Sequence, residues 1–172
     1  MSSAPQAVVV MGVCGCGKST VGERLARELD ALYVEGDAFH PAANVARMAA
    51  GIALSDDDRQ GWLEALAEQL AAARRDGHSV VLACSALKRR YRDVLRQGAP
   101  ELRVVHLHGE RDMLARRLAA RQGHYMPASL LDSQLAALGA PGPDERAIAL
   151  DAGTPTDTLV RSALAQLQRS PP

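Results

Sequence analysis

Lysine and aromatic residues are scarce in this chain of 172 residues. Of its 20 basic residues only two are lysines, Lys18 and Lys88, and Phe, Trp and Asn occur once each. Arginine therefore stands at almost every position that carries a cation. Because a compact ammonium group and a planar guanidinium are not interchangeable, we expect the two lysines to have roles that arginine cannot fill.

Other absences exclude whole classes of function. Lys+Arg and Asp+Glu are equal at 20 each, so the chain has no net charge that would attract nucleic acid or an anionic membrane. Its three Cys are too few for a disulfide framework, which suits a reducing cytoplasm. The apolar run over 7–13 is too short to span a bilayer, and no basic targeting segment precedes it. We expect a cytoplasmic protein with no nucleic-acid or membrane partner.

The chain length and the alternation of patterns predict one α/β domain over residues 1–172. Short apolar runs predict strands over 7–11, 31–35, 79–84, 102–107 and 147–150. Helical spacing predicts helices over 18–29, 41–50, about 62–75, 88–96, 110–121, 128–138 and 156–167. Strands that alternate with helices in this way favour a parallel sheet covered by helices on both faces.

A phosphate-binding loop follows the first predicted strand. The sequence from Gly12 to Ser19, G-V-C-G-C-G-K-S, matches G-x-x-x-x-G-K-[ST] and opens a helix. Glycines let the backbone N–H groups curl around phosphates, and the helix N-terminus adds its dipole. We expect Lys18 to reach the β- and γ-phosphates of ATP as a catalytic cation, and the Ser19 hydroxyl to ligate Mg²⁺. The predicted ATP-binding residues are Gly12, Val13, Cys14, Gly15, Cys16, Gly17, Lys18, Ser19 and Thr20.

Two other classes of P-loop protein do not fit. A GTPase normally carries N-K-x-D, but the chain's single Asn44 is followed by Val45, and the D-x-x-G match at 58–61 opens a helix instead of ending a strand. A motor or helicase needs a longer chain and an acidic end to a long apolar strand. The kinases of small metabolites remain.

Several segments after the P-loop resemble the gluconokinase family. They are G-D-A-F-H-P-A-A-N over 36–44, M-A-A-G-I-A-L-S-D-D-D-R over 48–59, C-S-A-L-K-R-R-Y-R-D-V-L-R over 84–96, R-L-A-A-R-Q-G-H-Y-M-P over 117–127 and L-L-D-S-Q over 130–134. The resemblance implies a five-stranded, shikimate-kinase-like P-loop fold with a small helical lid over about 117–135. It also implies ATP and Mg²⁺, D-gluconate as acceptor, 6-phospho-D-gluconate as product, and a homodimer.

One rival class of kinase has to be considered, and the chain departs from the family pattern at one position. A shikimate-type kinase expects two acids around the turn after the second strand and a glycine run after the third. Those positions are read here as Gly36-Asp37-Ala38 and Cys84-Ser85-Ala86. The family usually has Pro where this chain has Gly61, so we expect a looser helix start there.

The resemblance and the chemistry together assign the acceptor side. Asp37 is predicted to be catalytic and to orient or deprotonate the gluconate 6-hydroxyl; the alternative is a loop carboxylate. His40 either binds substrate hydroxyls or braces its loop. Arg59, Lys88 and Arg92 are candidates to hold the substrate carboxylate, which should favour gluconate strongly over glucose.

The predicted lid contributes three more residues. Arg117 and Arg121 lie four apart, on one helix face, and resemble lid arginines that neutralise charge on the γ-phosphoryl. Arg117 is assigned to ATP, Arg121 to catalysis, and His124 in the following segment to the substrate.

Other polar side chains receive structural interpretations. We expect the three acids over 56–58 to form a solvated helix start instead of a metal cluster, Trp62 to lie in the core, and Arg90, Arg96 and Arg111 to be solvated. In the family's sheet order the first and third strands are neighbours, which places Cys84 near the thiols of the P-loop. Because a helix N-terminus lowers a thiol's pKa, mild oxidation of a loop thiol is expected to inactivate the protein.

Overall fold

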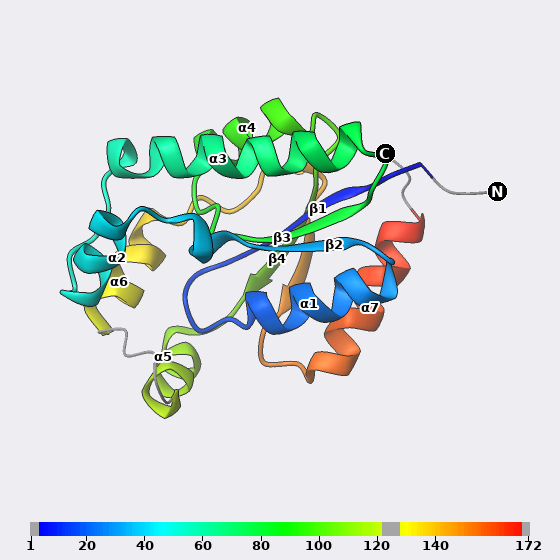
Figure 1. The fold of residues 1–172 in the computed structure, drawn as a ribbon. Coiled ribbons are helices and arrows are strands. Elements are labelled where there is room, and N and C mark those ends of the chain that lie inside the picture. The colour runs from blue at the N-terminus through cyan, green and yellow to red at the C-terminus, as the bar shows by residue number, and fades with distance from the viewer. Residues whose placement is uncertain (1–3, 122–127, 170–172) are drawn as a thin grey trace.

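The computed structural model describes residues 4–121 and 128–169 and forms one parallel sheet. Its strands lie in the order β2-β3-β1-β4-β5, and every neighbouring pair is parallel (Figure 1). The strands are β1 (Ala7–Met11), β2 (Leu32–Glu35), β3 (Val80–Ala83), β4 (Arg103–His108) and β5 (Ile148–Asp151). The predicted five-stranded α/β fold is confirmed, and β1 and β3 are neighbours as expected.

Helices cover both faces of this sheet. Figure 1 shows α3 and α4 above the sheet and α1 and α7 below it, while α2, α5 and α6 gather at the end where the strands finish. The helices are α1 (Lys18–Glu28), α2 (Ala42–Ala49), α3 (Asp56–Arg75), α4 (Arg89–Gly98), α5 (Arg111–Ala120), α6 (Ala128–Ala137) and α7 (Thr156–Arg169), with short 3-10 helices η1 (Gly36–Phe39) and η2 (Pro143–Glu145). None of the helices described is long and apolar enough to cross a membrane.

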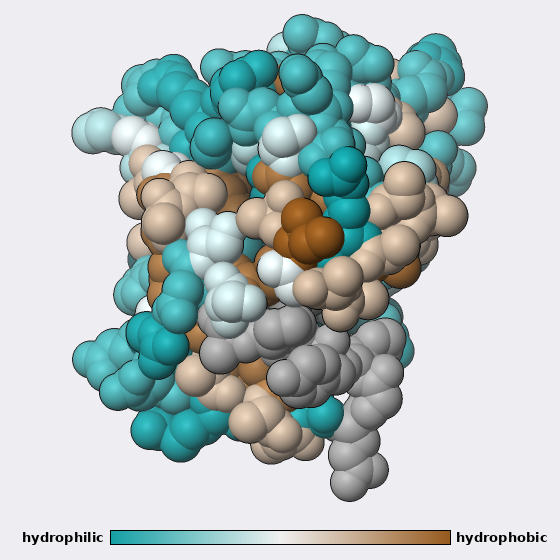
Figure 2. Space-filling model, turned by 90° about the vertical axis from the view of Figure 1, so that its left-hand side faces the viewer, coloured by the Kyte–Doolittle hydropathy of each residue, from teal (hydrophilic) through white to brown (hydrophobic). Residues whose placement is uncertain are grey.

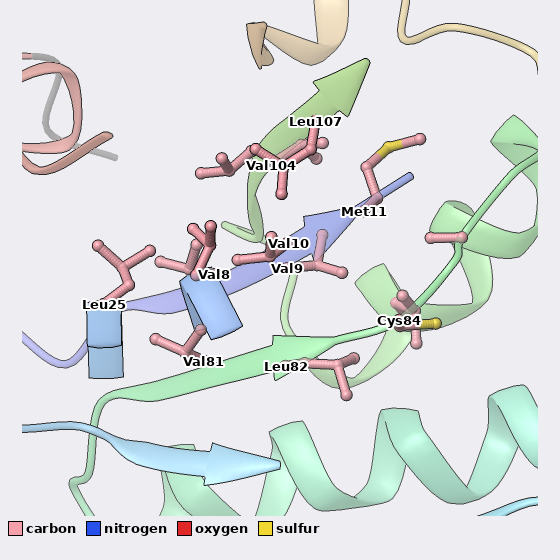
Figure 3. Close-up of a cluster of buried hydrophobic side chains, with 14 of the residues drawn as sticks. Val8, Val9, Val10, Met11, Leu25, Val81, Leu82, Cys84, Val104 and Leu107 are labelled. Atoms are coloured by element: carbon pink, nitrogen blue, oxygen red, sulfur yellow. The ribbon is translucent and has the colours of Figure 1, made fainter. Parts of the chain in front are cut away.

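The core lies on both faces of the central strands. All of β1 and β3 is buried, and Val8, Val9 and Val10 are fully buried between Leu25 of α1 and the neighbouring strands (Figure 3). Strands covered on both faces read as continuous apolar runs, which is why periodicity located them within one residue. This rigid sheet fixes where the loops after β1, β2 and β3 begin.

A capping box fixes the start of α3 at the acids over 56–58, where a helix start was expected. Ser55 Oγ accepts from the Asp58 N–H at 3.1 Å, and the Asp58 carboxylate accepts from the Ser55 N–H at 2.9 Å. This capping box begins the helix at Asp56, ahead of the predicted body. Gly61 therefore lies inside the helix and does not loosen its start. The helix-start interpretation of residues 56–58 is confirmed.

Candidate active site

The loops that follow β1, β2 and β3 meet at the carboxyl edge of the sheet. Open α/β sheets bind ligands at this edge. Figure 2 looks onto this side of the molecule, where apolar surface lies among polar margins. The exposed apolar side chains Phe39, Val45 and Ile52 belong to η1, α2 and the turn after α2, the segments that Figure 1 places at this end.

The P-loop has a backbone that requires glycine. Gly12 has φ 153°, and a Cβ there would lie 2.5 Å from the Leu107 carbonyl oxygen, so no larger residue fits. Gly17, with φ 93°, is the N-cap of α1, which begins at Lys18. The loop thus ends at a helix N-terminus whose backbone N–H groups point out of the helix. This geometry fits a bound phosphate chain.

Lys18 and Ser19 face two different neighbours. Lys18 Nζ donates to the Val13 carbonyl at 3.1 Å, within the P-loop itself. Ser19 Oγ donates to Glu35 Oε2 at 2.6 Å, and the Tyr33 hydroxyl donates to the same oxygen at 2.6 Å. Burial and the bond to Glu35 raise the pKa of Tyr33, so its hydroxyl stays protonated. The hydroxyl predicted to ligate Mg²⁺ therefore lies beside a carboxylate.

Glu35 was missed from the sequence. It ends β2 and lies two residues before Asp37, so two acids flank this turn. The argument against a shikimate-type kinase counted only Gly36-Asp37-Ala38 and so left out the acid at position 35. The signal was present as E-G-D, but its first acid was counted as part of the strand.

The turn that carries Asp37 is held firmly. A Cβ on Gly36 would lie 2.5 Å from the Ala83 carbonyl oxygen, so glycine lets the turn pack on β3. Trp62, which is 3% exposed, donates from Nε1 to the Gly36 carbonyl at 2.7 Å. Asp37 itself is exposed, and its carboxylate forms no hydrogen bond or ion pair with any described residue. A fixed backbone thus presents a carboxylate that is available to a ligand.

His40 lies against the same tryptophan. Its ring stacks on Trp62 with the centroids 3.9 Å apart, and Nδ1 lies 3.4 Å from the Asn44 amide nitrogen. Burial is the main cause that lowers the pKa of His40, so the ring is neutral at pH 7. Since the Asn44 nitrogen can only donate, Nδ1 accepts and Nε2 carries the proton. His40 braces its loop and retains one N–H donor.

Two predicted cations lie close to one aromatic ring. The Arg59 guanidinium is 5.3 Å from the Tyr91 ring centroid and Lys88 Nζ is 5.6 Å from it. Arg59 Nη1 donates to the Leu54 carbonyl at 2.7 Å and to the Tyr91 hydroxyl at 3.1 Å. Asp56 accepts from Lys88 Nζ at 3.0 Å and from the Tyr91 hydroxyl. The structure therefore brings Arg59 and Lys88 together.

Arg92 does not join them, which corrects its assignment to the substrate. The residue is 1% exposed and its guanidinium forms a two-pronged pair with Glu145, at 2.7 and 3.0 Å. The same group donates to the Ala86 carbonyl at 2.9 Å and the Gly139 carbonyl at 3.0 Å. All of these partners belong to the protein itself. Arg92 therefore joins the loop after β3 to the segment after α6.

Three other arginines were expected to be solvated. Arg96 donates to Glu145 at 2.7 Å and its side chain is only 21% exposed, so the expectation was wrong for this residue. Arg90 and Arg111 are largely exposed, as expected, but pair with Asp56 and Asp132.

Arg117 and Arg121, the arginines of the predicted lid, share a cavity with the P-loop. Its volume is about 280 Å³, and its lining includes Gly15, Gly17, Thr20, Arg117, Arg121, Thr154 and Thr156. Arg117 Nη2 also donates to the Ala152 carbonyl at 2.8 Å. The segment after β5 was not singled out from the sequence, because it carries no motif. Of the predicted lid, residues 122–127 lie outside the described residues, so the contact of His124 with substrate stays a prediction.

The thiols differ from the redox expectation. Cys14, Cys16 and Cys84 are free and buried. Burial raises the pKa of Cys14 in spite of the nearby Lys18, and raises the pKa of Cys84 to about 12. The lowered pKa expected from the helix N-terminus is therefore wrong for Cys14, because desolvation outweighs it.

A P-loop alone serves switches, motors and kinases alike, and the groups that face it distinguish these classes. Here the turn after β2 presents an available carboxylate, Asp37, and two cations, Arg59 and Lys88, lie close to Tyr91. Paired arginines lie on the nucleotide side. This arrangement is that of a P-loop kinase for a small metabolite.

Comparisons with known proteins identify the family. Residues 8–141 match the family described as AAA domain. A gluconokinase of Gluconobacter oxydans (strain 621H) is 44% identical over 168 residues, 98% of this chain and 94% of that protein. The thermoresistant gluconokinase of Escherichia coli (strain K12) is 40% identical over 162 residues, 94% and 93% of the two chains. The crystal structure of a gluconokinase from Sinorhizobium meliloti 1021 matches with a TM-score of 0.88 and 48% identity, over 98% and 94%. The chain belongs to the gluconokinase family.

Proposed function

We propose that this protein transfers the γ-phosphoryl group of ATP to the 6-hydroxyl of D-gluconate, which gives 6-phospho-D-gluconate and ADP. The relatives named above support the substrate. The observation that carries the proposal is the 2.6 Å bond from Ser19 to Glu35, because it joins the phosphate-binding loop to the turn that presents Asp37.

The nucleotide side uses the P-loop and the lid arginines. The backbone N–H groups of the loop hold the phosphates, apart from that of Cys14, which donates to Gln134, and Lys18 neutralises the β- and γ-oxygens. Arg117 and Arg121 border the same cavity and stabilise the charge that builds on the transferred group. Thr154 and Thr156 line the far side of this cavity, where we place the nucleoside.

Ser19 and Glu35 are suited to Mg²⁺. Both offer oxygen ligands, which hard divalent cations prefer, and Glu35 Oε2 lies 2.6 Å from the Ser19 oxygen. When bound there, Mg²⁺ would neutralise negative charge on the phosphates. Glu35 would bind the ion directly or through a water molecule. In both cases its bond with Ser19 Oγ would orient that hydroxyl.

Asp37 acts on the acceptor hydroxyl. Its carboxylate takes the proton of the gluconate 6-hydroxyl as that oxygen bonds to the γ-phosphorus. The bond from the γ-phosphorus to the bridging oxygen breaks, and ADP leaves with that electron pair. His40 donates a hydrogen bond from its Nε2–H group to a substrate hydroxyl. Arg59 and Lys88 hold the carboxylate at the other end of the sugar acid.

The substrate is tested by ADP release with gluconate, glucose, shikimate and adenylate as acceptors, at equal concentrations. We expect turnover with gluconate to exceed turnover with each of the others, and Lys18→Ala to abolish it. Faster turnover with shikimate or adenylate would contradict the proposal. From the family we also propose a homodimer in the cytoplasm, which sedimentation equilibrium and cell fractionation test.

A further inference from the structure

Gln134 of α6 reaches the P-loop across 120 residues of sequence. Its Oε1 accepts from the backbone N–H of Cys14 at 2.8 Å. A backbone N–H can only donate, so this bond fixes which end of the side-chain amide faces the loop. The oxygen faces Cys14 and the NH₂ group faces away.

The same peptide group is bonded at its other end. The N–H of Cys14 and the carbonyl of Val13 belong to one peptide plane, and in a trans peptide they point in opposite directions. The Val13 carbonyl accepts from Lys18 Nζ at 3.1 Å. Gln134 and Lys18 therefore hold the two ends of one peptide, and each bond polarises the other.

This peptide also sets the curvature of the loop. It lies between Gly12, with φ 153°, and Gly15, with φ 85°, where the backbone is easily rotated. The Val13 carbonyl accepts a further bond from the Cys16 N–H, at 3.4 Å. A rotation of the peptide would therefore move the ammonium group of Lys18 and the N–H groups that follow it.

Helix α6 is attached to other parts of the site as well. The Gly139 N–H, just after the helix, donates to the Leu87 carbonyl at 2.8 Å, next to Lys88. Asp132, near its start, pairs with Arg111 of α5 at 2.6 Å. Leu131 is fully buried, which holds the helix against the core. One rigid helix thus contacts the phosphate loop, the acceptor loop and the helix that carries Arg117.

We propose that Gln134 is a positioning residue for phosphoryl transfer, which fixes the Val13–Cys14 peptide and through it the place of the Lys18 ammonium group. The inference rests on the proposed kinase function. Without the Gln134 oxygen, the Cys14 N–H loses its partner, and only the bonds to the Val13 carbonyl oppose rotation of the peptide. Gluconate binding, which uses Asp37, His40, Arg59 and Lys88 on the proposed function, is unaffected, because Gln134 has no bond to any of them.

The contact is tested first, by selective ¹⁵N labelling of cysteine. The chain has three Cys, so the spectrum holds three amide signals, which single Cys→Ser variants assign. In Gln134→Leu we expect the amide proton signal of Cys14 to move upfield, because its hydrogen bond is lost. The amide signal of Cys16 should shift as well, because its N–H donates to the carbonyl of the same peptide. Cys84, whose N–H donates to the Val10 carbonyl within the sheet, serves as the internal reference. An unmoved Cys14 signal, or a Cys14 amide in the wild-type protein that exchanges as fast as an exposed one, would overturn the inference.

Kinetics test the role. In Gln134→Leu we expect kcat to fall by about 10–10²-fold, since small misplacements of reacting groups cost about that much. The gluconate Kd, followed through the fluorescence of Trp62, should change less than about twofold, because no contact on that side is lost. Gln134→Met serves as a second variant if Leu impairs folding, and Ser133→Ala on the same helix is the control. A kcat within twofold of wild type beside a displaced Cys14 signal, or equal losses of kcat, gluconate affinity and melting temperature, would overturn the inference. A wild-type protein inactive on gluconate would instead contradict the proposed function.

Discussion

Glu145→Gln should destabilise the protein strongly although it changes no group near the P-loop. The Glu145 side chain is 2% exposed and accepts from Arg92 at 2.7 Å and from Arg96 at 2.7 Å. It also accepts from the Gly142 N–H at 2.9 Å. The amide variant keeps the shape of the side chain but leaves the buried Arg92 without its counter-charge.

The pKa of Glu145 gives the size of the effect. Burial alone raises this pKa, but the bonds from Arg92, Arg96 and Gly142 outweigh it and hold the pKa at about 2, against an ordinary 4.5. At about 1.4 kcal/mol per unit, this difference corresponds to about 3 kcal/mol of folding free energy. Removing one partner of a buried pair costs about 3–5 kcal/mol in other proteins, so the two figures agree. The melting temperature should fall by roughly 6–12 °C.

The direction of the pKa shift fixes how the stability difference between the two proteins varies with pH. Because the folded pKa is depressed, the stabilisation is complete above pH 4.5 and is lost as the pH falls toward 2. Urea unfolding of both proteins should therefore show a gap at pH 7 that narrows below pH 4.5. Asp144→Asn is the matched control, because its pair with Arg89 is largely exposed and the change should be small. Equal stability at pH 7, or a gap that does not depend on pH, would refute the reasoning.

Three further outcomes are expected. Asp37→Asn should lower kcat by about 10²–10⁴-fold with nucleotide affinity intact, and a folded variant that keeps most of its turnover would make Asp37 a loop carboxylate. Arg59→Met should raise the KM for gluconate by about 10–100-fold, the contribution of a hydrogen bond to a charged group, without changing that for glucose. Gly61→Ala should stabilise the protein by about 1 kcal/mol in urea titrations, because the glycine is exposed inside α3 and a Cβ there meets nothing within 4 Å.

The strands and the P-loop could be predicted because their signals are local. A strand covered on both faces must be apolar throughout, and a phosphate-binding loop must carry glycine at fixed spacing. Asp37, Arg59 and Lys88 were located by family motifs, and the structure brings Arg59 and Lys88 around Tyr91. The roles of the three residues toward a substrate stay predictions.

The failures concern partners far apart in the chain. Nothing in the basic run over 89–96 shows that Arg92 points inward, because its partner Glu145 lies 53 residues away. The bond between Gln134 and Cys14 spans an even longer separation, 120 residues. Glu35 was overlooked because it completes a strand, although its neighbour Ser19 was assigned to Mg²⁺. A side chain's role in these cases depends on which elements the fold brings together.

The choice between gluconate and a neutral sugar depends on how charge is balanced around Tyr91. Lys88 already forms an ion pair with Asp56, so its charge stays balanced when a neutral acceptor binds. Arg59 differs, because its described bonds go to the uncharged oxygens of Leu54 and Tyr91, and none of the described carboxylates forms an ion pair with it. Asp56 also pairs with Arg90, so one carboxylate faces two cations there before Arg59 is counted. If the protein acts as proposed, Arg59 is therefore the cation whose charge a sugar acid would neutralise and a neutral sugar would leave without an ion-pair partner.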